Sequence, residues 1–397
     1  MKRFAGWYEM RAQLTSDFER FGRQLPPDFP AHVRDTYGID LSARYLGVAI
    51  RHPIGKGSGQ LSLKEEQLEA DATAGLAFSV LKTVIAQDEA GTQSMGAWAI
   101  HETKMVVEPI VSAGGKPGWT VTWKGRGWDR SFEEYLGLVR IGRDLSRAGR
   151  LLVVPSVKYH LPLLAEPFRE TEYAFTTAEL AKAWGESPLL LEKDFSPTLA
   201  GDPLADEQER ILRWIREIPR RIGEASALPV RIALKLMNAR FGEEFQLDML
   251  RTAAEAGAHT AVTFNRLFSS DRNVAYGGWD LSDRNLTVLD RARQNTARRI
   301  SLSGTGNIES GTTLLRYARA GCESVQLHTM FQLPLGEYPA TSGGRTERVL
   351  HKLVFDPRDG LVAGMLNMEQ AGDLPRRGGL LYFLDIPRLE QNENRSS

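Results

Sequence analysis

The stretch Ser301-Leu-Ser-Gly-Thr-Gly-Asn-Ile-Glu-Ser-Gly311 joins an apolar lead-in to a glycine-rich turn and the start of a helix. Gly304 and Gly306 carry no Cβ, so the backbone of this turn can approach a ligand closely. A helix that begins near Ser310 directs its N–H groups and the positive end of its dipole toward the turn, which favours a bound phosphate. Taken alone, the turn is explained equally well by a sharp strand-to-helix connection without a ligand.

A second segment of the same kind follows in Cys322-Glu-Ser-Val-Gln-Leu-His-Thr329, which is typical of a strand that ends in a small polar tip. Two consecutive strand–helix units with phosphate-compatible turns are typical of the seventh and eighth units of a (β/α)8 barrel.

The rest of the chain supports an α/β fold, because short apolar runs alternate with amphipathic stretches from Tyr45 onward. The runs predict strands buried on both faces, and the alternation predicts a parallel sheet. The predicted strands are Tyr45–Ile50, Ala77–Val84, Leu151–Val157, Leu189–Lys193, Ile232–Leu236, Thr260–Phe264, Ile300–Leu302 and Ser324–Leu327. The predicted helices are Phe132–Ala148, Thr177–Trp184, Asp206–Ile222, Phe245–Ala256, Thr287–Arg298, Gly311–Ala320 and Arg345–Gly360.

A count near eight favours a (β/α)8 TIM barrel over an open doubly wound sheet, and no Gly-x-Gly-x-x-Gly follows the first strand. We expect an N-terminal helical extension over residues 1–44, the barrel over 45–370 and a C-terminal tail over 371–397. Residues 87–128 interrupt the alternation with two strand-like pieces, Lys104–Ile110 and Trp119–Trp123. They predict a small sheet over the barrel mouth.

Composition excludes several classes of function. The 397 residues include 50 basic and 50 acidic ones, so a nucleic-acid groove or an acidic lipid surface is not expected. Cys322 is the only cysteine, which excludes an intrachain disulfide and a cysteine-ligated iron–sulfur cluster. No apolar run is long enough for a spanning helix and no signal peptide is expected, so the predicted location is cytoplasmic. The seven histidines show no metal-binding spacing, and no metal site is expected.

Two lysines interrupt predicted strands. Lys82 and Lys235 lie within short apolar runs, where an unpaired ammonium group would be costly. An anionic ligand is therefore a better explanation for both than a solvated surface charge.

An ordered set of motifs resembles the dihydroorotate dehydrogenase-like flavoproteins, which are FMN-binding (β/α)8 barrels. The motifs run through most of the chain and are Arg51-His-Pro-Ile-Gly-Lys-Gly-Ser-Gly-Gln-Leu-Ser62, Leu81-Lys-Thr-Val84, Leu234-Lys-Leu-Met-Asn238, Ala256-Gly-Ala with Val262-Thr-Phe-Asn265, Gly304–Gly311 and Val325-Gln-Leu-His-Thr329.

The resemblance implies a set of FMN-binding positions. Lys235 would lie at the N1–C2 edge of the flavin, where a cation stabilises the anionic reduced ring. Lys82 would contact the flavin, and Asn265 would lie beside the ring. Asn307 and His328 stand where the family usually has glycine. The full set of implied cofactor residues is Gly57, Ser58, Gly59, Lys82, Lys235, Asn265, Gly304, Gly306, Asn307, His328 and Thr329.

The resemblance also implies a catalytic position. In the family a Cys or Ser before a proline removes a substrate proton while hydride moves to the flavin, and Ser196-Pro197 occupies that place. A serine hydroxyl needs an activating neighbour or a water relay for this task. From the residues alone, a Ser-Pro turn explains the pair without any catalytic role.

The chain departs from the family where the family holds orotate. The departures are Asp194, Thr198, Arg126 and Arg266. A site built for one hydrogen-bond pattern rejects others strongly, so dihydroorotate is not the expected substrate. Asp194 suits an amine, and Arg126 suits a carboxylate; a surface Asp–Arg pair remains the competing interpretation.

The sequence thus predicts an FMN-dependent oxidoreductase that acts on a CH–CH bond of a small molecule, with an unknown electron acceptor and no nucleic-acid partner. A homodimer is compatible with the resemblance. The alternative is a barrel that keeps a phosphate or flavin site and serves as a non-catalytic binding or scaffold protein.

Overall fold

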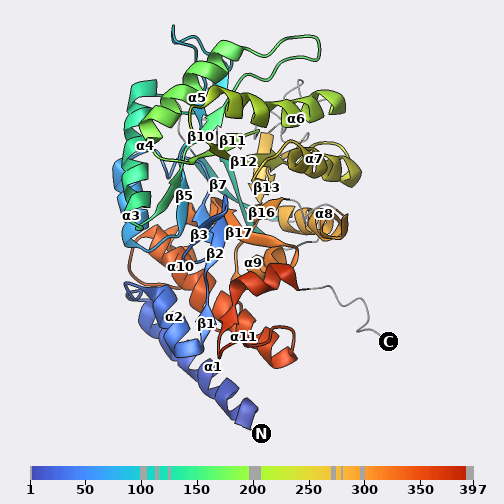
Figure 1. The fold of residues 1–397 in the computed structure, drawn as a ribbon. Helices are drawn as coiled ribbons and strands as arrows, with labels where there is room; N and C mark the ends of the chain where they lie inside the picture. The colour runs from blue at the N-terminus through green and yellow to red at the C-terminus, as the bar shows by residue number, and fades with distance from the viewer. Residues whose placement is uncertain are drawn as a thin grey trace.

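A curled parallel sheet surrounded by helices forms the body of the protein (Figure 1). The computed structural model describes residues 2–98, 105–111, 115, 117–123, 127–195, 207–269, 274–278, 280–295 and 300–389. The ten strands of this sheet are β4 (Ile54–Lys56), β5 (Phe78–Val80), β6 (Val84–Ile85), β9 (Leu152–Val154), β10 (Ser156–Lys158), β11 (Leu189–Asp194), β12 (Val230–Met237), β13 (Thr260–Asn265), β16 (Ser301–Gly304) and β17 (Cys322–Leu327).

The strand pairing explains the curl. The order is β6-β10-β11-β12-β13-β16-β17-β4-β5-β9, and each printed pair is parallel. Only Pro155 separates β9 from β10, while β5 and β6 are parts of one short segment. The two ends of the order therefore belong to the same two neighbouring segments, and the sheet resembles a barrel. Every residue of β11 is buried, as expected for a strand covered on both faces.

Helices follow the strands along the chain and pack outside the sheet (Figure 1). They are α3 (Glu65–Thr73), α4 (Phe132–Arg147), α5 (Glu170–Trp184), α6 (Gln208–Ala225), α7 (Glu243–Glu255), α8 (Leu281–Asn295), α9 (Gly311–Arg319), α10 (Arg345–Phe355) and α11 (Leu361–Ala371). Four described 3-10 helices are η1 (Gly96–Trp98), η5 (Thr329–Phe331), η6 (Leu335–Glu337) and η7 (Phe383–Arg388). The start of α4 is encoded locally, because Ser131 and Glu134 form a capping box. Sequence patterns had predicted neither α3 nor α11.

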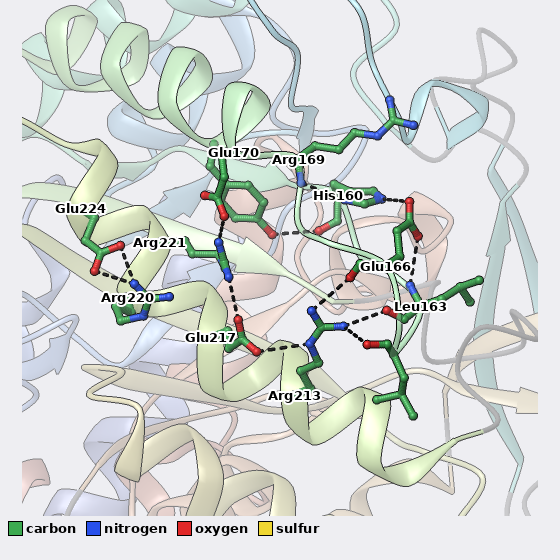
Figure 2. Close-up of polar contacts among 12 residues, drawn as sticks. His160, Leu163, Glu166, Arg169, Glu170, Arg213, Glu217, Arg220, Arg221 and Glu224 are labelled. Carbon is green, nitrogen blue, oxygen red and sulfur yellow. Dashed lines mark hydrogen bonds and ion pairs between the residues drawn. The ribbon is translucent and has the colours of Figure 1, made fainter.

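Arginine side chains of α6 fix the loop that follows β10 (Figure 2). Arg213 donates to the carbonyl oxygens of Leu163, Leu164 and Glu166 at 2.8, 2.7 and 3.1 Å, and it pairs with Glu217 on its own helix. Three carbonyl groups that have no strand partner are thus satisfied by one guanidinium group. The loop at the carboxyl end of β10 is therefore anchored to α6, the helix of the next strand–helix unit along the chain.

The N-terminal extension consists of α1 (Lys2–Phe21) and α2 (Phe29–Tyr37) (Figure 1). Helix α1 lies beside α10 and α11, and Phe29 of α2 packs against Phe355 of α10. Leu14 and Phe21 of α1 are buried, in keeping with a packing role for this segment. A two-residue strand, β1 (Ile39–Asp40), then pairs in parallel with β18 (Leu381–Tyr382). Among the described residues, no helix combines the length and the apolarity needed to cross a membrane.

One predicted strand proved wrong. Tyr45–Ile50 does not join the large sheet but forms part of an antiparallel hairpin of β2 (Ala43–Tyr45) and β3 (Val48–Ile50). Leu46 and Gly47 have φ angles of 51° and 71°, and two consecutive positive φ values suit a two-residue hairpin turn. The first strand of the parallel sheet is instead β4, which precedes the predicted flavin-contacting Gly57.

The predicted small sheet exists and is larger than the sequence indicated. Strands β7 (Met105–Val111) and β8 (Pro117–Trp123) pair with each other, and β8 pairs with β15 (Val274–Gly278). Strand β14 (Leu267–Ser269) completes an antiparallel sheet in the order β14-β15-β8-β7. The second hairpin follows β13 and was not predicted, because Gly277 and Gly278 weaken its strand pattern.

Candidate functional site

A cavity of about 190 Å³ lies between the carboxyl ends of β13, β16 and β17 and the antiparallel sheet. Five of the predicted cofactor positions and one predicted substrate position line it: Asn265, Gly306, Asn307, His328, Thr329 and Arg266. The opposite wall includes Trp119 of β8 and both glycines of β15. The structure therefore brings together, in one cavity, residues that lie far apart in the sequence.

The glycine-rich turn is held in place from behind. The hydroxyl group of Tyr317 in α9 donates to the carbonyl oxygen of Gly306 at 2.7 Å, and Asn285 Nδ2 donates to that of Thr305 at 2.7 Å. Gly306 has a φ of +107°, and a Cβ there would lie 2.5 Å from Asn285 Nδ2. Glycine is required at this position both by backbone geometry and by space.

The helix start predicted after this turn is confirmed. Helix α9 begins at Gly311, and the Ser310 side chain accepts a hydrogen bond from Thr313 N as its N-cap. Gly304 also has a packing role, while the cofactor role that the resemblance implies for it stays a prediction. A Cβ at Gly304 would lie 2.5 Å from the Tyr317 ring, so this glycine permits close packing of β16 against α9.

His328 is half-buried at the second turn, where its ring packs against Gly59 and both ring nitrogens are shielded from solvent. A Cβ at Gly59 would overlap that ring. Burial lowers the pKa of His328 to about 3, and the positive charges of Arg266, Lys235, Lys82 and Lys56 contribute to the same direction. The imidazole is therefore neutral at physiological pH.

Gly57 and Ser58 connect this turn to the next strands. Gly57 N donates to Leu327 O at 2.9 Å, which fixes the end of β4 beside β17. Thr83 donates to Asp194 Oδ2 at 3.1 Å and lies 2.9 Å from the hydroxyl oxygen of Ser58. Because Thr83 has a single hydroxyl proton, Ser58 is the donor in their contact. Asp194 is thereby oriented by a short chain of hydroxyl groups.

Three cationic side chains lie close together at the carboxyl ends of the parallel strands, a region called the mouth of the sheet below. Lys82, Lys235 and Arg266 are 2%, 5% and 3% exposed. Burial, then the charge of Arg266, lowers the pKa of Lys82 to about 8, while Asp129 and Asp194 act in the opposite direction. Both predicted lysines are thus buried. Their positive charges are close enough to each other to affect the pKa of Lys82.

Sequence reasoning missed a buried polar group beneath these cations. Glu192 of β11 is fully buried and its Oε1 atom lies 3.6 Å from Lys235 Nζ. Its other carboxylate oxygen accepts hydrogen bonds from Tyr45 and Gln326 at 2.9 and 2.7 Å. The signal was a glutamate directly after the three leucines of β11, a position where a carboxylate needs a partner. Predicted site residues Ser196, Thr198 and Arg126 lie outside the described residues.

The chain has a recognisable structural neighbour despite a divergent sequence. No protein-family model matches it. No curated protein sequence matches it either. Its fold is similar to the crystal structure of DHODH in complex with ferulenol from Eimeria tenella, with a TM-score of 0.59, 11% sequence identity and coverage of 89% of each chain. At this identity the likeness shows the fold, and the site must be argued from its own residues.

The packing of His328 on Gly59 leads to a prediction about stability. Replacement of Gly59 by alanine should lower the free energy of unfolding by about 1–3 kcal/mol, because the new methyl group overlaps the buried ring. Denaturant unfolding of G59A would measure the loss. The double variant G59A/H328G removes the overlap and should recover part of it; a double variant less stable than the sum of both single effects would contradict the packing.

Proposed function

We propose that the protein is an FMN-dependent oxidoreductase that acts on a CH–CH bond of a small substrate other than dihydroorotate. The observation that carries this proposal is the convergence of Lys82, Lys235 and Arg266 at one end of the curled sheet. This end lies beside the cavity that is lined by the glycine-rich turn and by the turn at His328. Buried cations are costly unless an anion compensates them. An anionic phosphate and a flavin that becomes anionic on reduction would both do so.

The residues present fit such a cofactor. Gly306 and Asn307 adopt positive φ values of +107° and 47°, so the turn exposes backbone to the cavity in a conformation suited to a cradle. Helix α9 begins directly after it and adds the positive end of its dipole. Bound FMN would supply a hydride acceptor.

The proposal also includes closure of the sheet as an eight-stranded (β/α)8 barrel, in which β5 with β6 and β9 with β10 each count as one strand.

The roles of the chain's own residues follow from this placement. Lys235 would lie at the N1–C2 edge of the flavin, Lys82 and Asn265 beside the ring, and the turns at Gly306–Asn307 and His328–Thr329 would hold the phosphate. Neutral His328 can donate one ring N–H to the phosphate. Asp194, oriented by Thr83, would accept a hydrogen bond from the substrate, and Ser196 would remove its proton.

The first prediction of the proposal concerns the cofactor. The purified protein should show the visible absorbance of oxidised flavin, and heat should release FMN rather than FAD.

The affinity of the protein for FMN should fall as the pH rises through about 8, because Lys82 loses its positive charge there. Titration of the cofactor-free protein with FMN between pH 6.5 and 9.5 would measure this. K82M should bind more weakly at pH 7 and show a flatter profile, whereas K182M, which changes an exposed lysine of α5, is the control. Failure to bind FMN would favour the scaffold alternative.

The second prediction concerns the proton-abstracting residue. Replacement of Ser196 by alanine should slow substrate-dependent reduction of the flavin by about 10²–10⁴-fold while FMN binding stays unchanged. Anaerobic stopped-flow reduction at 450 nm, roughly the flavin maximum, would follow the step. Equal reduction rates in S196A and the unaltered protein would remove Ser196 from this role.

The third prediction concerns specificity. Replacement of Asp194 by asparagine keeps the side-chain shape and its contact with Thr83 but removes a negative charge. The set of small molecules that reduce the flavin should therefore shift away from amines, with a loss in kcat/KM of about tenfold or more for the best amine substrate. A screen of the same compound panel against both proteins tests this. An unaltered profile would place Asp194 outside the substrate site.

A further inference from the structure

The Lys235 ammonium group has a partner that the cofactor proposal does not explain. Glu192 lies on the neighbouring strand, fully buried, with Oε1 at 3.6 Å from Lys235 Nζ. Oε1 has no hydrogen-bond partner within the described part of the chain, so Lys235 is its principal electrostatic contact. A buried carboxylate in this position must be either paired with the ammonium group or protonated.

Two hydrogen bonds hold the other oxygen of the carboxylate, and a third joins the two donor side chains. Glu192 Oε2 accepts from Tyr45 at 2.9 Å and from Gln326 Nε2 at 2.7 Å, and the same Gln326 nitrogen lies 2.8 Å from the Tyr45 hydroxyl oxygen. These partners come from the hairpin and from β17, across the interior of the curled sheet. Hydrogen bonds to the ionised form favour it. The carboxylate is thus fixed in orientation and its negative charge is supported on both sides.

The charge of Lys235 reaches the proposed cofactor site. It contributes to the lowered pKa of both Lys82 and His328, which lie at the mouth. A carboxylate immediately behind Lys235 offsets this positive field, since charges interact strongly where water is excluded.

We propose that Glu192 is a positioning residue and buried counter-ion that limits the positive charge Lys235 presents to the mouth of the sheet, and thereby lowers the reduction potential of a flavin bound there. The second part rests on the proposed function. The groups that influence the carboxylate are Lys235, Asp194, Tyr45 and Gln326, and the charge of Glu192 in turn acts on Tyr135. Burial raises the pKa of Glu192, and Lys235, Gln326 and Tyr45 oppose that shift.

The test compares the FMN-loaded protein with E192Q and Y45F. Glutamine keeps the shape and removes the charge, so the reduction potential of the flavin should become more positive. Sulfite, which adds to oxidised flavin and leaves negative charge on the ring, should bind about tenfold more tightly. Y45F keeps the ring that stacks on Phe78 but loses one hydrogen bond to Glu192, so it should shift the potential in the same direction by less, and more at lower pH. An E192D variant should stay close to the unaltered protein.

A second readout needs no flavin. In cofactor-free E192Q, Lys235 should be acetylated by acetic anhydride at pH 8 about tenfold faster than in the unaltered protein, because its side chain is no longer held in an ion pair with Glu192. Mass spectrometry would compare Lys235 with the half-buried Lys352 as the internal reference. Equal rates would overturn the pairing, and so would an unchanged or more negative potential in both E192Q and Y45F. If the unaltered protein bound no flavin, the proposed function would fail while the acetylation rates still decided the pairing.

Discussion

Compensation of buried charge is the constraint on which the centre of this protein depends. The curled sheet places Glu192, Lys235, Lys82 and Arg266 where little water reaches them. Removing such groups from water costs several kcal/mol each unless other charges or hydrogen bonds replace the solvent. Part of the compensation is internal, through the pairing of Glu192 with Lys235 and the effect of Asp194 on Lys82. The proposed anionic cofactor would supply a further part, and this links stability of the fold to its chemistry.

The parts of the fold that the sequence predicted are those with strong local signals. The segment Ser301–Gly311 became β16, a turn and α9, because glycine geometry and the Ser310 cap act over a few residues. The Phe132–Ala148 prediction ended within one residue of α4, whose capping box is equally local. Tyr45–Ile50 failed for the opposite reason. Its apolar pattern suits a strand, but the hairpin turn at Leu46–Gly47 reverses the chain, and a leucine with positive φ gives no warning in the sequence.

The site could be predicted only as a set of separate fragments. Gly306 was singled out because it has no Cβ and lets the backbone approach a ligand, and Lys82 and Lys235 because a charge inside a predicted apolar strand is rare. The structure adds the relations between them, which depend on strand register and on packing across the sheet. Nothing in the local sequence of Gln326 indicates that it meets Glu192, since the two lie on strands that are far apart along the chain. The close packing of Gly304 against Tyr317 likewise became visible only in the structure.

The antiparallel sheet shows how segments without a recognisable motif form one wall of the cavity. Strands β8 and β15 come from two excursions of the chain, after β6 and after β13, and their pairing joins two hairpins into one sheet. Their pairing sets Trp119 and Gly278 opposite Arg266 and Asn307 in the same cavity. The ends of the parallel strands supply one face of the cavity, and the antiparallel sheet supplies the opposite one. A ligand that bridges the two faces would therefore contact both the ends of the parallel strands and the antiparallel sheet, so the side chains of either face select which ligands fit.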